Sequence, residues 1–399
     1  MKSPLPKVRT VQSWPRRATL ALADEPLKGD TSAAVEPQPL APARWDWQSV
    51  RRVLVVRLRS IGDTVLATPA LYALRRFLPA ARIDVLLEDW VAPLLKGSEL
   101  VDQVLTIERG NVASRARVVR ALRAARYDVA YNLHGGTTAT LLTRASGARH
   151  RVGYASYQYS RLHNHAAPPA TEIWRRPETH SAEQQLALLG WTGVPVSDRP
   201  AARLAVTAEA DASLDQKFAA ASLNDEQFNP SRPFALMHPA AAFETKQWAT
   251  ENFARVAEAL AARGLQVISV VAPREEAVNS ALVRESSAPV LSLSRLSLPE
   301  VTALAARARL FVGNDSGIAH IASATGTPAV VVFGSSNVTH WRPWTRGSVR
   351  AEVVREELAC QPCPGYTCAE FDAPECIRRV RVEQVVSAIE RVLEERDEG

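Results

Sequence analysis

Short apolar runs alternate with helical stretches along this chain, and the alternation occurs in two separate series. The first series begins at Val53-Leu54-Val55-Val56, which has the continuous hydrophobicity of a strand buried on both faces. It predicts strands over 53–56, 83–87, 103–107 and 129–133, with helices over 64–78 and 114–125. Such alternation is typical of a parallel sheet that is covered by helices.

The second series starts at Phe234 and continues to the end of the chain. Strands are predicted over 234–237, 265–271, 290–293, 310–312 and 329–333. Helices are predicted over 251–263, 276–284, 299–306, 318–325 and 382–394. The fold class that follows is α/β, with two doubly wound domains in series. Ligands of such domains bind beyond the carboxyl ends of the strands, so we expect two facing domains to form a cleft.

Four segments follow from these two series. Residues 1–48 hold 7 of the 26 prolines and lack periodicity, which predicts a flexible extension. Residues 49–205 and 233–399 are the expected domains, and the polar, alanine-rich stretch 206–232 is the expected linker region. A length of 399 residues suits two domains of about 100–200 residues each.

Positive charge is concentrated in the middle of the chain. Residues 49–205 carry 22 Lys and Arg against 12 Asp and Glu, whereas residues 206–399 carry 19 against 25. A basic lobe beside an acidic one fits a polyanionic partner on one side, such as nucleic acid, a phosphorylated lipid or an anionic membrane surface. A solvated arginine-rich surface is the alternative.

Several motif classes are absent from the sequence. No G-x-G-x-x-G, G-x-x-x-x-G-K-[ST], H-E-x-x-H or G-x-S-x-G occurs, which counts against common dehydrogenases, P-loop ATPases, zinc proteases and serine hydrolases. No apolar run reaches the roughly 18 residues of a membrane span. The six-residue stretch 18–23 is too short for a signal-peptide core, so we expect a cytoplasmic protein.

The segment from Arg57 to Thr64 follows the first strand directly. Gly62 permits a tight turn, and Asp63 then lies at the start of the next helix. A helix cap is the simpler explanation of Asp63. A carboxylate base at the carboxyl end of the strand, facing the cleft, is the functional hypothesis.

The segment from Gly313 to His320 lies between a buried strand and a helix. Amides at a helix N-terminus bind phosphate, and Gly317 would allow an anion to approach closely. His320 follows Ser316 by four residues and is therefore expected on the same helical face. Lys246, which follows the strand at 234–237, could neutralise a diphosphate leaving group. An ordinary capped helix and a solvated lysine are the alternatives.

All four cysteines lie in one segment, as Cys360, Cys363, Cys368 and Cys376. Clustered thiols in a cytoplasmic protein suggest a structural zinc site more than disulfides. The last spacing is irregular for a zinc ribbon, so reduced or regulatory thiols stay an alternative.

Taken together, these segments resemble glycosyltransferase family 9, the ADP-heptose:lipopolysaccharide heptosyltransferases. The run from Val53 to Asp63 is similar to the opening motif of that family, and the segments around Lys246 and from Asn314 to His320 fall where the family contacts its nucleotide sugar. The cysteine cluster also resembles one found in many members. The similarity spans roughly residues 50–395.

The resemblance implies a GT-B fold and an inverting sugar transfer without a catalytic metal. It makes Asp63 the general base and puts Arg57, Arg59 and Ser60 on the acceptor side. It assigns the ADP-sugar to the segments that contain Ala241, Ala242, Lys246, Glu276, Leu296, Asp315, Ser316, Gly317 and His320. Where relatives often have hydroxyl residues, this chain has Ala241 and Ala242, so only their backbone N–H groups could contact a phosphate there.

The resemblance also gives the basic lobe a partner other than nucleic acid. The family's acceptor, a lipopolysaccharide inner core on lipid A, is anionic, which predicts a protein peripheral to the cytoplasmic face of the inner membrane. The expected basic surface consists of Arg57, Arg59, Arg115, Arg117, Arg120 and Arg123. Two other functions stay open: the same reaction with another nucleotide sugar or a protein acceptor, and a catalytically silent binding protein.

Overall fold

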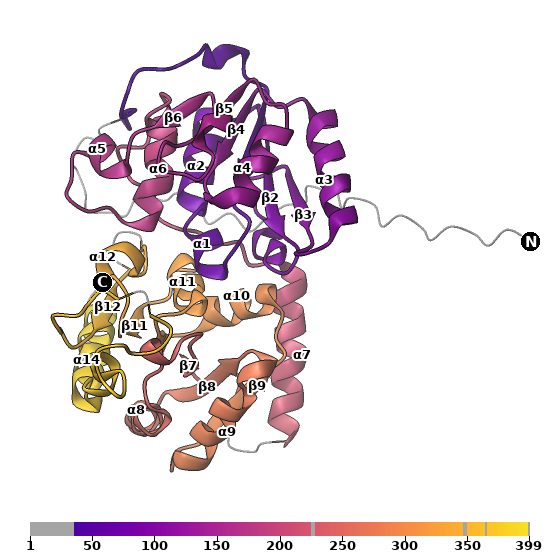
Figure 1. Cartoon of the computed structure of the whole chain (residues 1–399). Coiled ribbons are helices and arrows are strands. Elements are labelled where there is room, and N and C mark those ends of the chain that lie inside the picture. Colours follow the sequence, from indigo (N-terminus) through magenta and orange to yellow (C-terminus); the bar gives the residue numbers. More distant parts are fainter. Residues whose placement is uncertain (1–35, 225–227, 346–348, 364, 398–399) are drawn as a thin grey trace, which may run out of the picture.

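Each half of the chain forms a six-stranded parallel sheet in the computed structural model, which describes residues 36–224, 228–345, 349–363 and 365–397 (Figure 1). The first sheet has the order β3-β2-β1-β4-β5-β6. Its strands are β1 (Arg52–Val56), β2 (Arg82–Glu88), β3 (Gln103–Ile107), β4 (Val129–Asn132), β5 (His150–Tyr154) and β6 (His165–Ala167).

The second sheet repeats this arrangement with the order β12-β11-β10-β7-β8-β9. Its strands are β7 (Phe234–His238), β8 (Gln266–Val271), β9 (Val290–Ser294), β10 (Leu310–Asn314), β11 (Ala329–Val332) and β12 (Ala351–Val354). The strand order reverses between β1 and β4 in one sheet and between β7 and β10 in the other. These reversals are the points at which doubly wound sheets bind ligands. The prediction of two doubly wound α/β units is confirmed.

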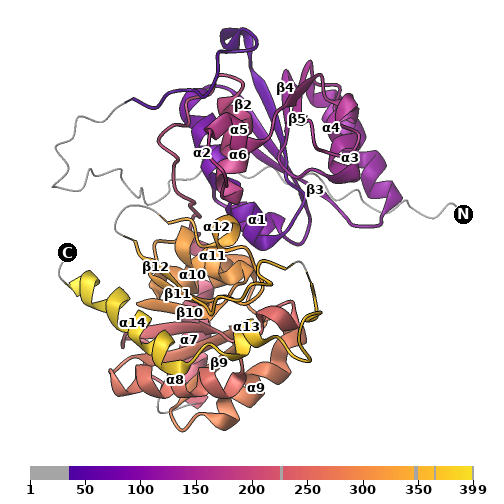
Figure 2. The same ribbon diagram turned by 60° about the vertical axis from the view of Figure 1, so that its left-hand side comes forward.

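Helices cover both faces of each sheet (Figures 1 and 2). Each sheet and its helices are called a lobe below. The helices of the first lobe are α1 (Ile61–Val65), α2 (Thr68–Phe77), α3 (Val112–Ala125), α4 (Gly136–Ala145), α5 (Ala170–Trp174) and α6 (Ser181–Gly190). Those that follow are α7 (Ala208–Asn224), α8 (Thr250–Ala262), α9 (Glu276–Glu285), α10 (Leu298–Arg307), α11 (Gly317–Ala324), α12 (Val338–Trp341), α13 (Glu375–Arg378) and α14 (Val382–Asp397). Single 3-10 turns are η1 (Trp47–Ser49), η2 (Ala92–Leu95), η3 (Ser160–Leu162), η4 (Glu244–Lys246) and η5 (Pro273–Glu275).

Alternate residues of the central strands enter different cores. Val53 and Val55 of β1 pack with side chains of α2 and α6, whereas Leu54 and Val56 pack with side chains of α3 and α4. Successive side chains of a strand point to opposite faces, so a strand covered on both faces must be apolar throughout. This is why the run at 53–56 is a reliable mark of the first sheet.

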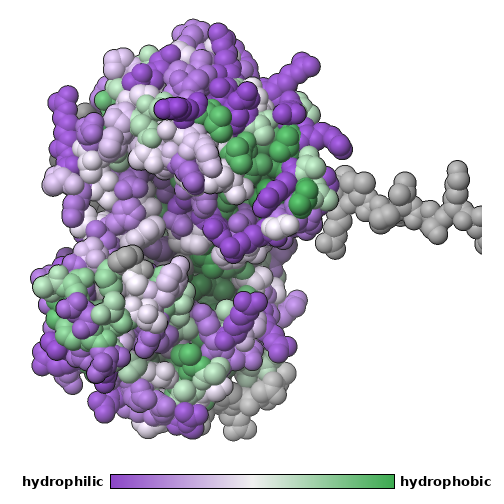
Figure 3. All heavy atoms as spheres, viewed as in Figure 1, coloured by the Kyte–Doolittle hydropathy of each residue, from purple (hydrophilic) through white to green (hydrophobic). Residues whose placement is uncertain are grey.

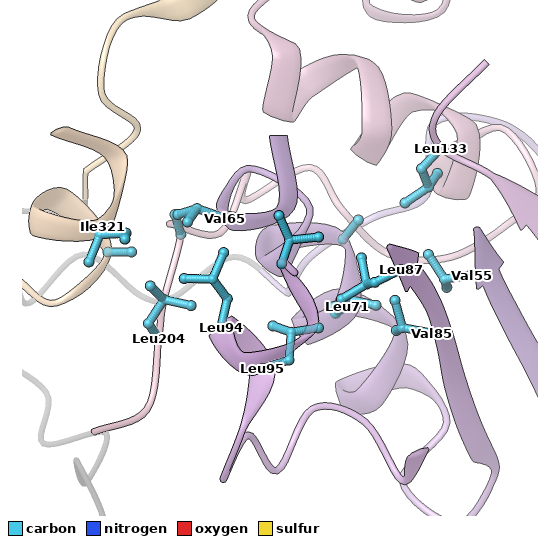
Figure 4. Close-up of a cluster of buried hydrophobic side chains, with 14 of the residues drawn as sticks. Val55, Val65, Leu71, Val85, Leu87, Leu94, Leu95, Leu133, Leu204 and Ile321 are labelled. Carbon is cyan, nitrogen blue, oxygen red and sulfur yellow. The ribbon is translucent and has the colours of Figure 1, made fainter. Parts of the chain in front are cut away.

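One hydrophobic core is continuous across the two lobes. Val65 of α1, Leu94 of η2 and Leu204 lie beside Ile321 of α11 (Figure 4). All four side chains are buried. Removing such a surface from water stabilises the contact by about 25 cal/mol per Å². The lobes are therefore joined by an apolar contact beneath the cleft.

The helix predicted over 64–78 is two helices in the structure. α1 ends at Val65 and α2 begins at Thr68, with Pro69 in its first turn. A proline lacks the N–H that would bond to the residue four positions earlier, and its ring clashes with that carbonyl. Thr68 Oγ1 instead donates to the Val65 carbonyl at 2.7 Å.

The flexible extension predicted over 1–48 needs correction for its described part. Residues 36–48 pack on the first lobe, where the Leu40 and Ala41 N–H groups donate to the Gly190 carbonyl at 3.0 and 3.1 Å. Trp47 is buried and donates through Nε1 to the Thr192 carbonyl at 2.9 Å. Prolines in this segment suit an extended strap as well as a mobile tail. Residues 1–35 lie outside the described part of the chain.

The region predicted as a linker contains the helix α7. Arg307 of α10 forms ion pairs of 2.6 Å with both Asp211 and Asp215 of α7. Leu214, between these two residues in the sequence, is fully buried in the core. Residues 208–224 therefore belong to the helical layer of the second sheet.

Most of the surface in the view of Figure 3 is hydrophilic, and hydrophobic side chains gather in smaller areas on both lobes. Among the described residues, no helix combines the length and the apolar character required to traverse a bilayer.

Candidate functional site

Asp63 lies at the carboxyl end of β1, at the switch point of the first sheet. The Ser60 N–H and Ser60 Oγ both donate to Asp63 Oδ2 at 3.1 Å, which is the capping arrangement of α1. Asp63 is nevertheless only half-buried and lines a cavity in front of the strand. The cap and the cleft-facing carboxylate, which the sequence left as alternatives, therefore occur together.

Arg57 is bound within the site. Its guanidinium forms an ion pair with the Asp63 carboxylate, and its Nη1 donates to His134 Nδ1 at 3.1 Å. The Arg57 side chain is only 9% exposed. Its expected place on an exposed, anion-binding surface is therefore wrong: the charge of Arg57 is directed at Asp63. Arg59 and Ser60 lie beside this pair and are accessible.

His134 holds Arg57 as a neutral imidazole. Burial, followed by the charge of Arg57, lowers the pKa of His134 to about 4. Because Nδ1 accepts the bond from Arg57, the ring proton of neutral His134 is on Nε2. His134 therefore orients the guanidinium without adding a charge.

The second lobe presents Lys246 and Asp315 at its own switch point. Lys246 follows β7 and its Nζ donates to Asp315 Oδ2 at 2.8 Å. Asp315 follows β10, is buried, and also accepts from Ser336 Oγ. An ammonium held in this way is a fixed positive group at the carboxyl ends of the strands.

The preceding residue, Asn314, fixes the two loops that carry this pair. Its Oδ1 accepts from the Trp248 N–H at 3.1 Å, and its Nδ2 donates to the Pro239 carbonyl at 2.9 Å. Asn314 is fully buried. The loop that carries Lys246 is thereby tied to the end of β10.

Ser316, Gly317 and His320 lie at the start of α11, directly against α1 of the other lobe. A Cβ atom added to Gly317 would lie 2.7 Å from Ile61 Cβ, and one added to Gly62 would lie 2.7 Å from His320 Cδ2. Ser316 Oγ and His320 Nδ1 are both buried without a hydrogen-bond partner. Buried polar atoms normally have partners, so these two are available to a ligand or a water.

His320 is enclosed by groups of both lobes. Burial lowers its pKa, Asp315 and Asp63 act in the opposite direction, and Lys246 lowers it further. Charges that act on a single imidazole lie close to it, so His320 stands between the carboxylate of the first lobe and the ion pair of the second.

The remaining predicted donor contacts occupy the same edge of the second sheet. The Ala241 N–H donates to Gln247 Oε1 at 2.8 Å, so this amide is already bonded and is not offered to a phosphate. Glu276 begins α9 after β8, and its carboxylate lies 3.7 Å from Arg295. Leu296 follows β9 and is half-buried, while Ala242 is exposed.

A cavity of about 310 Å³ lies in front of Asp63 and between the lobes. Its walls come from the strand ends of the first sheet, from α6 and from α12 of the second lobe. The lining residues are Arg57, Asp63, Leu133, His134, Tyr154, Tyr157, Ser181, Gln184, Gln185, Leu188, His340 and Trp341. A larger hollow of about 560 Å³ around Arg75 and Gln103 lies at the opposite edge of the first sheet.

The segment with four cysteines packs on the loop that carries Lys246. The Cys363 N–H donates to the Ser335 carbonyl at 3.0 Å, and Thr245 Oγ1 donates to the Gly365 carbonyl at 2.9 Å. Burial and then the neighbouring thiols raise the pKa of Cys376 to about 11. Over the described ranges, no group of three or more His, Cys, Asp or Glu side chains is placed to hold a metal ion. The zinc site at the four cysteines stays a prediction.

Several residues of the site were not identified from the sequence. His134 precedes two glycines directly after a strand, as in Asn132-Leu133-His134-Gly135-Gly136, and this pattern could have indicated it. Ser336 likewise follows the strand β11. Nothing in the sequence brings His340 and Trp341 of α12 to the first lobe, because that contact depends on how the two lobes pack.

Comparisons with known proteins show which family the chain belongs to. The family model for glycosyltransferase family 9 (heptosyltransferase) matches residues 115–373, more than half of the chain. Lipopolysaccharide heptosyltransferase 3 of Escherichia coli is 28% identical over an alignment of 319 residues, which covers 73% of this chain and 86% of that protein.

Solved structures of related proteins share the fold. The crystal structure of the glycosyl transferase family 9 from Veillonella parvula DSM 2008 superposes with a TM-score of 0.74 at 20% identity, covering 86% of this chain and 98% of that one. The structure of E. coli ADP-heptose lps heptosyltransferase II gives a TM-score of 0.70 at 21% identity, covering 87% and 99%. The expected GT-B arrangement is therefore confirmed. On the match of its family model, this chain belongs to glycosyltransferase family 9, the heptosyltransferase family.

Proposed function

We propose that this protein is an inverting heptosyltransferase that transfers heptose from ADP-heptose to a lipopolysaccharide inner-core acceptor. The observation that carries the proposal is the pairing of two strand-end sites. Asp63 belongs to the first lobe and the Lys246–Asp315 pair to the second, while His320 is influenced by all three charges. The similarity to lipopolysaccharide heptosyltransferases supports the donor and the acceptor class.

In this proposal Asp63 is the general base. Direct displacement at the anomeric carbon requires a group that takes the proton of the acceptor hydroxyl as the new bond forms. Arg57 and the two Ser60 donors hold the Asp63 carboxylate in the cavity wall. The acceptor hydroxyl enters from the cavity, and its proton passes to the free face of the carboxylate.

The second lobe holds the leaving group. Negative charge grows on the diphosphate as the bond between sugar and phosphate breaks, and fixed donors stabilise it. Lys246 and the amides at the start of α11 supply those donors, together with the unpartnered Ser316 Oγ. This assignment relies less on Ala241, whose amide is bonded to Gln247.

The acceptor is proposed to be anionic and to lie at a membrane surface. Arg115, Arg117, Arg120 and Arg123 are exposed along α3 at the edge of the first sheet. Each basic side chain near an anionic membrane contributes about 1 kcal/mol of attraction. Replacing the four arginines by glutamine should abolish binding to vesicles that contain anionic lipid, while turnover on a short soluble acceptor is retained.

The enzyme assay uses purified protein, ADP-heptose and truncated core oligosaccharides, with transfer followed by mass spectrometry. Asp63→Asn should lower kcat by at least about 100-fold while the Kd for ADP-heptose stays within about twofold, since a general base contributes 10²–10⁴-fold. Asp215→Asn, an exposed carboxylate on α7, is the matched control and should keep full activity. Absence of transfer from ADP-heptose to every core acceptor would refute the proposal. Transfer from another nucleotide sugar, or to a protein, would replace it with the alternative named above.

A further inference from the structure

The cavity beside Asp63 is lined by residues of both lobes and is partly open to solvent. Ser181, Gln184 and Gln185 of α6 line one part of it, and His340 and Trp341 of α12 line a neighbouring part. His340 is held there because its Nδ1–H donates to the Thr179 carbonyl of the first lobe at 3.2 Å. A volume of about 310 Å³ is at the lower limit of small-molecule sites, which suits a single sugar ring.

This cavity contains no uncompensated positive charge. Among its described lining residues, Arg57 is the one arginine and lysine is absent, and Arg57 is already paired with Asp63. His134 is neutral because it accepts a bond from Arg57, and burial lowers the pKa of both His134 and His340.

An anionic group placed in the inner part of this cavity would lose hydration without gaining a counter-charge from the lining residues, since the accessible Arg59 is not one of them. The cost of burying an unpaired charge in a protein is several kcal/mol. The arginines that flank α6 are committed elsewhere, since Arg176 and Arg199 both bind Glu183 at 3.0 and 3.1 Å. The walls therefore disfavour phosphate and carboxylate groups.

The same walls suit sugar hydroxyls. The Oε1 atom of Gln185, a buried residue, has no hydrogen-bond partner, although its Nε2 donates to the Leu66 carbonyl at 3.1 Å. An unbonded buried acceptor costs about 1–3 kcal/mol, which a hydroxyl donor would recover. Tyr154, Tyr157 and Trp341 add aromatic surface against which the C–H face of a sugar can pack.

We infer that the cavity binds the acceptor through an uncharged sugar ring, which carries hydroxyls but no phosphate or carboxylate. The reacting hydroxyl of that ring faces Asp63, and negative groups elsewhere on the acceptor stay outside with the exposed arginines of the first lobe. This inference rests on the proposed function and specifies its acceptor.

The test compares two acceptor fragments that differ only in the charge of the terminal ring. One ends in an uncharged heptose, and the other in the same ring with a phosphate on a hydroxyl that does not react. The wild-type protein should show a kcat/KM at least about 100-fold higher on the uncharged fragment, because a site without a counter-charge rejects a buried anion. Equal or higher kcat/KM on the phosphorylated fragment would overturn the inference and leave the proposed function intact. No transfer to either fragment would overturn both.

Two variants locate the preference in the cavity. Gln184→Arg adds a cation to the wall and should shift the ratio of kcat/KM values towards the phosphorylated fragment by at least about 10-fold, with the KM for ADP-heptose unchanged. Trp341→Ala should raise the KM for the uncharged fragment at least about 10-fold, again without changing the KM for the donor. Trp90→Ala, an indole 49% exposed outside the cavity, is the matched control. An unchanged ratio in Gln184→Arg, in protein shown to be folded by its thermal transition, would contradict the inference.

Discussion

Gly62 and His320 meet across the two lobes so closely that a Cβ atom on Gly62 would lie 2.7 Å from His320 Cδ2. Gly62 belongs to α1, and His320 belongs to α11 of the other lobe (Figures 1 and 2). Each residue also lies near its own strand-end group, Asp63 or Asp315. The contact therefore helps to set the distance between the Asp63 and Asp315 sides of the site.

Gly62→Ala should separate the lobes. The added methyl group has no space without movement of the imidazole, and overpacking a buried contact costs about 1–3 kcal/mol. We expect a lower midpoint of urea unfolding and at least a 10-fold loss of kcat, because small displacements of reacting groups are costly to catalysis. Equilibrium unfolding and steady-state kinetics measure the two effects.

A second variant, His320→Ala, shows whether the destabilisation by Gly62→Ala arises at the contact between these two residues. In a His320→Ala background the methyl group has space, so the destabilisation by Gly62→Ala should shrink by more than about 0.5 kcal/mol, the deviation from additivity that independent sites show. An undiminished penalty in that background would mean that Gly62 acts through something other than His320.

The stability of the protein should fall steeply as the pH falls below about 6.5. Burial lowers the pKa of His180 to about 3, and its Nε2–H donates to the Arg342 carbonyl of the second lobe at 2.7 Å. In the unfolded chain His180 is protonated near pH 6.5, whereas in the folded protein it is not. The contribution of His180 to the free energy of unfolding is therefore greatest above pH 6.5 and is lost as the pH falls towards 3. Between pH 6.5 and 5 the loss from His180 alone is about 2 kcal/mol.

Chemical denaturation of the wild type and of His180→Asn at pH 7 and pH 5 measures the loss of stability that is due to His180. Asparagine does not titrate and retains an acceptor for the N–H of Ala182, which His180 Nδ1 binds at 3.0 Å. The variant should therefore lose less stability between the two pH values than the wild type. Parallel losses in both proteins would show that His180 is not the titrating group.

Lys246 is expected to bind the donor. A test of that role must distinguish it from the contribution that the ion pair with Asp315 makes to stability. Lys246→Met leaves the buried Asp315 carboxylate with Ser336 as its remaining side-chain donor, which should destabilise the protein by about 3–5 kcal/mol. The double variant Lys246→Met/Asp315→Asn removes both charges and should recover most of that stability. Its KM for ADP-heptose should stay at least about 10-fold above that of the wild type, since the charged hydrogen bonds to diphosphate are lost. Lys217→Met on α7 is the control, and a normal donor KM in the double variant would exclude Lys246 from the donor site.

Elemental analysis of the native protein tests the zinc prediction. One zinc per chain, with thiols that react only after chelation, would confirm the expectation drawn from the spacing of the cysteines. Metal-free protein in which Cys360, Cys363, Cys368 and Cys376 all react with a thiol reagent would contradict it.

The sequence was sufficient for the elements that are buried on both faces. The apolar runs at 53–56, 234–237 and 310–312 each lie within a central strand of the structure. The edge strands β6 and β12, and β5 beside β6, were not predicted, because β6 and β12 have only three and four residues and β5 and β6 begin with the polar residues His150 and His165.

Some residues of the candidate site could likewise be predicted from the sequence, and others could not. Asp63, Lys246 and Asp315 follow central strands, so their positions could be predicted from the switch-point rule. The enclosure of Arg57 by Asp63 and His134 depends on side-chain packing between β1 and β4, and α12 reaches the cavity only through the contact between lobes. Neither feature has a local sequence pattern.

A crystal structure with an unreactive ADP-heptose analogue tests the central claim most directly. The account predicts the diphosphate on Lys246 and the amides that follow Ser316, with the Asp63 carboxylate turned towards the face of the anomeric carbon opposite to the phosphate. A diphosphate bound away from the start of α11, or an Asp63 carboxylate directed away from the sugar, would contradict it.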